Sequence, residues 1–156
     1  MEKILLYLQD QKIRDEAIRQ LNDKYEIVFC KNLNALKREM KKKLFRIALI
    51  DIVIKRGKDK FDISSFDLVR NSFQNTKSHR GPLYYSGTMA ITAMMNEKYT
   101  NIFRANMARY FSDHTPIFTS KGRLLIYDRT YGPNFDWGGH VNYMERFLIE
   151  DETYWL

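Results

Sequence analysis

The feature that most constrains this chain is the alternation of short apolar runs with helical repeats in its first 50 residues. Largely apolar runs at 4–8, 25–30 and 46–50 are short enough for strands and apolar enough to be covered on both faces. Between these runs, apolar residues recur at the spacing of an amphipathic helix. The recurring residues are Ile13, Ala17, Ile18 and Leu21, followed by Leu33, Leu36, Met40 and Leu44. A strand-helix-strand-helix-strand order predicts a parallel sheet with right-handed crossovers.

The remainder of the chain has a less regular pattern. A helix is predicted around 66–73 and a fourth strand at 82–86, which glycines flank on both sides. A long helix is predicted over 89–111. The segments 117–119 and 124–127, separated by a glycine turn, predict a β-hairpin. A short final helix is indicated by Val141, Met144, Phe147 and Leu148.

Length and composition exclude several classes of protein. A chain of 156 residues suggests a single domain. Its one cysteine, Cys30, excludes an internal disulfide and any zinc site built on two or more cysteines. No apolar run approaches the roughly 18 residues that a membrane span needs, and the N-terminus lacks the pattern of a signal peptide. We therefore expect a cytoplasmic protein that does not enter a membrane.

The common enzyme motifs are absent from the sequence. Residues 8–13 contain no glycine, so no glycine-rich phosphate loop follows the first strand. The chain has no Gly-x-Ser-x-Gly motif, and its three histidines are too far apart for metal-ligand spacing. These absences favour a protein that is not an enzyme.

Three segments resemble the receiver domain of bacterial response regulators. Residues 3–10 stand where a receiver has its first strand and acidic pair. Residues 45–51 stand where it has the strand that ends in the phosphorylated aspartate, and 82–87 where it has its fourth strand and switch residue. The resemblance covers about residues 3–95. It implies an α/β fold with a flavodoxin-like doubly wound parallel sheet, in one domain that spans the whole chain. From about residue 96 the chain diverges, with a hairpin and a short helix in place of the expected ending.

The resemblance also implies roles for individual residues. Asp51 stands where a receiver has its phospho-acceptor, and Ser86 stands where it has its switch hydroxyl. The receiver's lysine at the end of the fifth strand is missing, and Lys121 is the nearest candidate for it. Without the resemblance, an aspartate that ends a strand and a serine beside a glycine are ordinary strand-end and turn residues.

The acidic site departs from the receiver pattern. Leu8 and Gln9 occupy the positions of the acidic pair, so only Asp10 and Asp51 are left as candidate ligands of Mg²⁺. We therefore expect phosphotransfer to be lost and no cofactor to be needed. Mg²⁺ would be required only if Asp10 and Asp51 still form a functional site.

A second interpretation applies to the C-terminal half. The order of its elements is also that of a winged helix-turn-helix, with 88–97 as second helix, 101–111 as recognition helix and 117–127 as wing. Asn and Arg can pair with base edges in a major groove, and cations at a wing tip can meet phosphates. The candidate DNA-binding residues are Asn101, Arg104, Asn106 and Arg109 on the helix, with Lys121 and Arg123 on the wing.

Basic residues cluster in two places, six of them at 37–46 and four at 55–60. Such clusters either neutralise phosphates or form a solvated surface. Aromatic residues concentrate between 127 and 155, where they either fill the core or form an interface. Taken together, the sequence favours a signalling or regulatory module that contacts a protein partner or forms a homodimer. A DNA-binding transcriptional regulator is the alternative.

Overall fold

The computed structural model describes the chain in several stretches that hold a sheet and three helices. The described residues are 1–42, 44–52, 55–56, 61–62, 65, 68, 89–97, 117–118 and 124–155. The helices in these stretches are α1 (Gln11–Leu21), α2 (Leu33–Lys42) and α5 (Trp137–Trp155). The strands are β1 (Lys3–Tyr7), β2 (Glu26–Phe29), β3 (Ile47–Asp51), β4 (Lys55–Arg56), β5 (Phe61–Asp62), β6 (Met89–Asn96), β7 (Ile117–Phe118) and β8 (Leu124–Tyr131).

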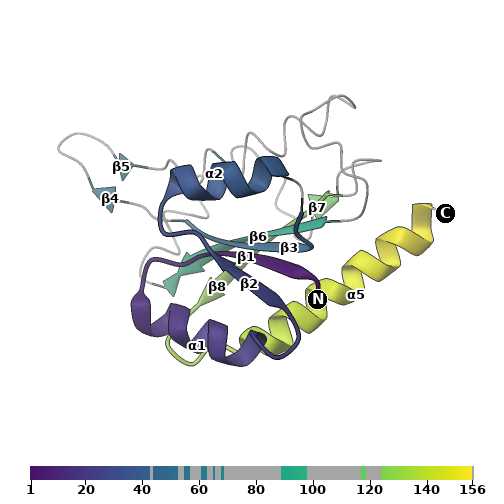
Figure 1. The fold of residues 1–156 in the computed structure, drawn as a ribbon, viewed down its shortest axis with the longest axis horizontal. Helices are drawn as coiled ribbons and strands as arrows, with labels where there is room; N and C mark the ends of the chain where they lie inside the picture. The colour runs from purple at the N-terminus through teal and green to yellow at the C-terminus, as the bar shows by residue number, and fades with distance from the viewer. Residues whose placement is uncertain are drawn as a thin grey trace.

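The main sheet has six strands in the order β2-β1-β3-β6-β8-β7. Its first five strands pair in parallel, and β7 pairs antiparallel with β8 at the edge. The short strands β4 and β5 form a separate antiparallel pair. Helix α2 covers one face of the sheet, and α1 and α5 lie together on the other (Figure 1). The predicted doubly wound parallel sheet of flavodoxin-like order is confirmed.

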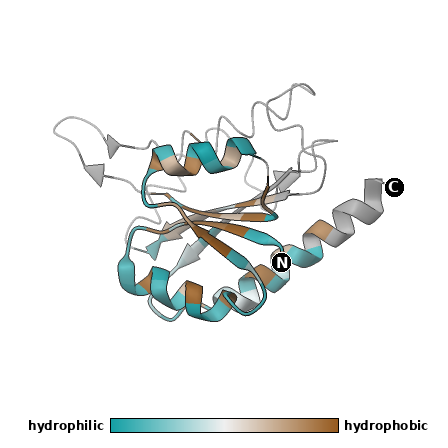
Figure 2. Cartoon of the chain, in the orientation of Figure 1, coloured by the Kyte–Doolittle hydropathy of each residue, from teal (hydrophilic) through white to brown (hydrophobic). Residues whose placement is uncertain are grey.

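The central strands β1 and β3 are mainly apolar because helices cover both faces of the sheet. All five residues of β3 are buried, as are the last four of β1. The brown strands in the centre of Figure 2 contrast with the mainly teal outer surfaces of α1 and α2. On the α1 and α5 face, a cluster of buried side chains forms an apolar core. It contains Ile4, Leu6, Leu8, Ala17, Leu21, Ile47, Leu49, Ala90, Met94, Tyr131, Trp137, Val141, Met144 and Leu148.

Local capping defines where the first two helices begin. The Asp10 carboxylate accepts a hydrogen bond from the backbone N–H of Ile13 at 3.0 Å, which makes Asp10 the N-cap of α1. The Asn32 side chain accepts a hydrogen bond from the backbone N–H of Ala35 at 2.8 Å, at the start of α2. Both helices therefore start at a side chain that satisfies an otherwise unpaired backbone donor.

The predicted helix over 89–111 is wrong for its first eight residues, which form strand β6. Alanine and methionine dominate this segment. Because both residues favour helices in isolation, local propensity predicts a helix where a strand forms. In the fold the segment lies between β3 and β8 and pairs with both. The second helix of the winged-helix interpretation falls on the same residues and is wrong for the same reason. The strand predicted at 82–86 lies outside the described residues.

The predicted hairpin is confirmed, but it is part of the main sheet. β7 pairs with β8 in antiparallel fashion, while the other edge of β8 pairs in parallel with β6. β8 also continues to Tyr131, four residues beyond the predicted end. Because its inner edge is occupied by β6, this hairpin is not a free-standing wing.

The final helix is longer than predicted. α5 runs from Trp137 to Trp155 and packs beside α1, so the hairpin precedes this helix and does not replace it. Within the part of the chain that the structure describes, α5 included, no helix combines the length and apolarity needed to cross a bilayer.

Candidate functional site

The polar residues of the candidate site lie where the parallel strands end. β1, β3, β6 and β8 all point the same way, so their carboxyl ends share one edge of the sheet. Open α/β sheets bind ligands at this edge. The structure brings Gln9, Asp51, Asn96 and Tyr131 to it, and the register pairs Asn96 directly with Tyr131.

Asp51 is the buried centre of this site. Its side chain and backbone are together only 5% exposed. Its Oδ2 atom accepts a hydrogen bond from the backbone N–H of Gln9 at 3.3 Å, and the Tyr131 hydroxyl also stabilises the carboxylate by hydrogen bonding. Burial outweighs these two donors and, with the nearby charge of Asp10, raises the pKa of Asp51 to about 6.

Tyr131 lies at the end of β8, the fifth parallel strand, where the sequence shows no equivalent of the receiver's lysine. It is 2% exposed, and burial together with the Asp51 charge raises the pKa of its hydroxyl, which therefore stays protonated as a donor to Asp51. A hydrogen bond from Asn96 acts in the opposite direction on the same hydroxyl. The proposed substitute Lys121 lies outside the described residues. The signal missed in the sequence was a tyrosine directly before Gly132 and Pro133, which mark the end of a strand.

The end of β1 supplies no side-chain carboxylate to Asp51. Leu8 is 1% exposed and belongs to the apolar core, and Gln9 contributes its backbone N–H. The Asp10 carboxylate is committed to capping α1. Arg14 holds this turn in place, because its Nη1 atom donates to the Leu8 carbonyl at 3.3 Å.

These residues do not fit a magnesium ion. Mg²⁺ requires hard oxygen ligands in a near-octahedral arrangement, usually with one or two carboxylates directed at it. Asp51 is buried and already hydrogen bonded, and Asp10 faces the first turn of α1. Among the described residues there is no group of three or more His, Cys, Asp or Glu side chains that could hold a metal.

A further carboxylate lies at the same edge, beside the end of β8. A Cβ atom on Gly132 would come within 2.8 Å of Glu97 Oε1, so a larger residue at this position would require the Glu97 side chain to move. Sequence reasoning did not single out Asn96 or Glu97, because it placed them in a helix.

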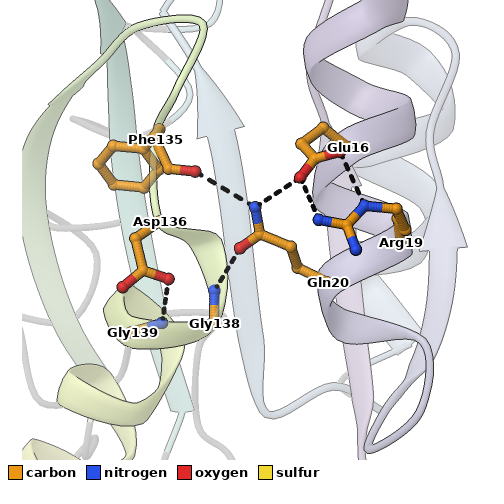
Figure 3. A network of polar contacts seen from close by, with 7 residues as sticks. All are labelled: Glu16, Arg19, Gln20, Phe135, Asp136, Gly138 and Gly139. Atoms are coloured by element: carbon orange, nitrogen blue, oxygen red, sulfur yellow. Dashed lines mark hydrogen bonds and ion pairs between the residues drawn. The ribbon is translucent and has the colours of Figure 1, made fainter.

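A second polar network fixes the start of α5 and thereby supports the site (Figure 3). Gln20 of α1 accepts from the backbone N–H of Gly138 at 3.0 Å and donates to the Phe135 carbonyl at 3.4 Å. Asp136 accepts from the N–H of Gly139 at 2.9 Å and acts as the N-cap of α5. A side chain on Gly139 would displace this cap, which explains the glycine.

The network places aromatic side chains behind Tyr131. The ring of Trp137 is 1% exposed, and its centroid lies 5.7 Å from that of Tyr131 and 4.6 Å from that of Phe135. Part of the aromatic concentration near the C-terminus is therefore core packing. Tyr143, which is 41% exposed, is a described member that faces solvent.

The other residues singled out from the sequence are not in the described part of the chain. They are Ser86 of the receiver-like site, and Asn101, Arg104, Asn106, Arg109, Lys121 and Arg123 of the DNA-binding alternative. Their assignments stay predictions.

Comparison with known proteins identifies the fold. No family model matches this sequence, and a search of curated proteins finds no match. Among solved structures, the chain is similar to a response regulator receiver domain protein (CheY-like) from Methanospirillum hungatei JF-1. The two share 15% sequence identity and a TM-score of 0.55, over 98% of each chain. The strand order, the buried aspartate at the end of β3 and this similarity show that the chain has the fold of a CheY-like response regulator receiver domain.

Proposed function

We infer that this protein is a receiver-like, non-enzymatic signalling module that acts by contact with a protein partner and has lost phosphotransfer at Asp51. The observation that carries the proposal is the state of the Asp51 carboxylate. It is buried, it is held by the Gln9 N–H and the Tyr131 hydroxyl, and the end of β1 directs no second carboxylate toward it.

Phosphorylation of an aspartate places a highly charged group where the carboxylate was. A bound divalent cation normally offsets that charge and orients the transferred group. With Leu8 and Gln9 in place of two acids, the site lacks the ligands for such a cation. Tyr131 in addition occupies the space beside Asp51 and is held there by packing against Trp137. A phosphoryl group would have to displace a buried, packed tyrosine.

A receiver fold without phosphotransfer can still bind a partner through its surface. The polar network of Gln20 and the Trp137 packing connect the site to both α1 and α5. A partner that binds this pair of helices, including a second copy of the chain, would therefore contact the elements that support Tyr131 and Asp51. This arrangement supports a role based on binding.

The test is a nuclear magnetic resonance titration of the whole chain with Mg²⁺ and then with beryllofluoride, a phosphoryl mimic. We expect wild type and Asp51→Asn to respond identically, with no saturable shift of the Gln9, Asp51 or Tyr131 amides. Saturable shifts in wild type that Asp51→Asn abolishes would show a working phospho-acceptor and overturn the proposal.

A gain-of-function pair makes the same test sharper. Gln9 is exposed, so Gln9→Asp adds a carboxylate beside Asp51 at little cost to folding, and Gln9→Asn is the neutral control. We expect Gln9→Asp to bind Mg²⁺ measurably more tightly than wild type and Gln9→Asn to match wild type. If all three proteins bound Mg²⁺ with the same affinity, in the millimolar range, the missing carboxylates would not explain the loss of phosphotransfer.

A further inference from the structure

One short segment of the chain carries a strong local excess of positive charge. Residues 31–46 contain seven of the 26 basic residues and one of the 19 acidic residues, a net charge of +6 out of +7 for the whole chain. Residues 1–30 contain five basic and six acidic residues, a net charge of −1. α2 and its flanks therefore carry a strong local excess of positive charge, of which Arg46 is paired with Glu145 of α5.

The fold turns this charge outward on a single helix. Leu36 and Met40 form the buried side of α2, with exposures of 0% and 5%. On a helix with 3.6 residues per turn, positions 38, 41 and 42 lie away from that buried side and position 37 lies beside it. The four residues at these positions are all exposed, and we name them the α2 basic face: Lys37, Arg38, Lys41 and Lys42.

The α2 basic face is arranged at some cost to the helix itself. Lys37 and Lys41 are four residues apart, as are Arg38 and Lys42, and like charges at this spacing destabilise a helix. Lys41 and Lys42 interact favourably with the C-terminal end of the helix dipole, but Lys37 and Arg38 are too far from it. Among the described residues, the ion pair on this face is that of Lys42 with Glu39 at 2.8 Å. Residual repulsion of this kind is relieved by an anionic partner.

We propose that the α2 basic face binds the phosphate backbone of a nucleic acid, without reading its sequence. Lysine and arginine on an exposed helix neutralise phosphates and release the condensed counterions, which is the main source of such binding. Lys37 and Lys41 lie about 6 Å apart along the helix axis, and so do Arg38 and Lys42, which allows the two rows to follow neighbouring phosphates.

The same observations argue against the two other classes of anionic partner. A helix that lies in a membrane interface inserts its apolar face, but the apolar face of α2 is already packed on the sheet. Protein interfaces are depleted in lysine and enriched in aromatic anchors, and the α2 basic face has three lysines and no aromatic residue. Leu44, which is 65% exposed just beyond the helix, is a single apolar residue and not a patch.

This inference is independent of the fate of Asp51 and of the predicted recognition helix. α2 lies on the opposite face of the sheet from α1 and α5 (Figure 1), and its cations come from residues before β3. Loss or retention of phosphotransfer changes none of the charges that carry it.

The experiment is fluorescence anisotropy with a labelled random duplex of about 20 base pairs, titrated at several salt concentrations from about 50 to 200 mM. Wild type is expected to bind with a slope of log affinity against log salt of about −4, as four phosphate contacts require. Lys37→Gln/Lys41→Gln should reduce the slope to about −2 and weaken binding at least about tenfold at the middle of the salt range. Circular dichroism confirms that α2 is retained.

Lys12→Gln/Lys24→Gln is the matched control, because it removes the same charge from exposed positions on the α1 side. It should change the affinity less than about threefold, since general charge is screened beyond a Debye length. Equal losses in the two double variants would overturn the proposal, as would absence of duplex binding at the lowest salt. Wild-type binding to phosphatidylserine vesicles in preference to the duplex would also overturn it.

Discussion

The two faces of the sheet differ in the kinds of interaction that their helices make. The face under α1 and α5 combines an apolar cluster with polar links within the chain. Gln20 joins α1 to the start of α5, and the Arg46–Glu145 ion pair at 2.8 Å joins α5 to the residue before β3. On the other face, the apolar side of α2 packs against the sheet, and its outer side carries four cations and one paired acid.

The comparison distinguishes polar groups that stabilise the folded state from charged groups that do not. On the α1 and α5 face, the polar groups named above have partners within the chain, and Gln20 holds the start of α5, where Trp137 packs against Tyr131. On the α2 face, the outward charges contribute little to folding and oppose one another. The first face should therefore respond to mutation with changes in stability, and the second with changes in binding.

Trp137→Ala should have the largest effect on stability. Trp137 is fully buried between Tyr131 and Phe135, and truncating such a side chain costs about 3–5 kcal/mol through lost burial and a residual cavity. The free energy of unfolding in urea, followed by circular dichroism, measures it. A loss below about 1 kcal/mol would mean that the α1 and α5 face does not depend on this packing.

Asp51→Asn should stabilise the protein at neutral pH by about 1–2 kcal/mol. Burial raises the pKa of Asp51 from 3.8 to about 6, so its charged form costs the folded state at most about 3 kcal/mol at pH 7. The amide retains part of the hydrogen bonding and removes the charge. Urea unfolding of both proteins across the pH range measures the difference.

The pH dependence of that difference has a defined sign. Because the folded pKa of Asp51 is raised, its favourable contribution is present below about pH 4 and is lost as the pH rises through 6. The advantage of Asp51→Asn should therefore be largest at pH 7 and vanish near pH 4. His140, whose pKa burial lowers to about 4, changes stability in the opposite sense, but it is present in both proteins and cancels. A difference that does not vary with pH would contradict the burial of an ionised Asp51.

Gln20→Ala should destabilise the chain by about 1 kcal/mol. It removes the acceptor for the Gly138 N–H at the start of α5, and lost helix-start interactions cost about this much. Gln20→Glu keeps an acceptor and serves as the control. Hydrogen exchange at Gly138 should increase in Gln20→Ala alone, and unchanged protection would show that Gln20 does not hold this end of α5.

Lys37→Glu should have the smallest effect on stability, a gain of a few tenths of a kcal/mol at low salt. It turns a repulsive pair with Lys41 into an attractive one at the favourable spacing and orientation. The gain should disappear at high salt, because exposed pairs are screened. The same variant should lose duplex binding, so that stability and binding move in opposite directions. If Lys37→Glu lost both stability and duplex binding, the α2 basic face would contribute to the stability of the fold.

The N-terminal half of the fold was predictable because its signals are local. The first three strands and two helices each have an apolar pattern of their own, and Asp10 and Asn32 mark where the helices begin. Asp51 could be located at the edge of the sheet on the same basis. The segment at 89–96 was not predictable, because Ala and Met residues buried on both sides have no periodicity and favour helices when considered alone.

From composition and spacing alone, the chain already specified a parallel α/β sheet, the aspartate at the end of β3, the absence of an acidic pair before α1, and the concentration of charge at residues 31–46. All of these depend on residues close together in the chain. The fourth strand, the place of the hairpin inside the sheet, and the contact of Tyr131 with Asp51 depend on segments that meet only after folding. Residues 51 and 131 are far apart in sequence, and pairing of β6 with both β3 and β8 brings them to one edge. Long-range strand pairing overrides local propensity, and it brings these two side chains into one site.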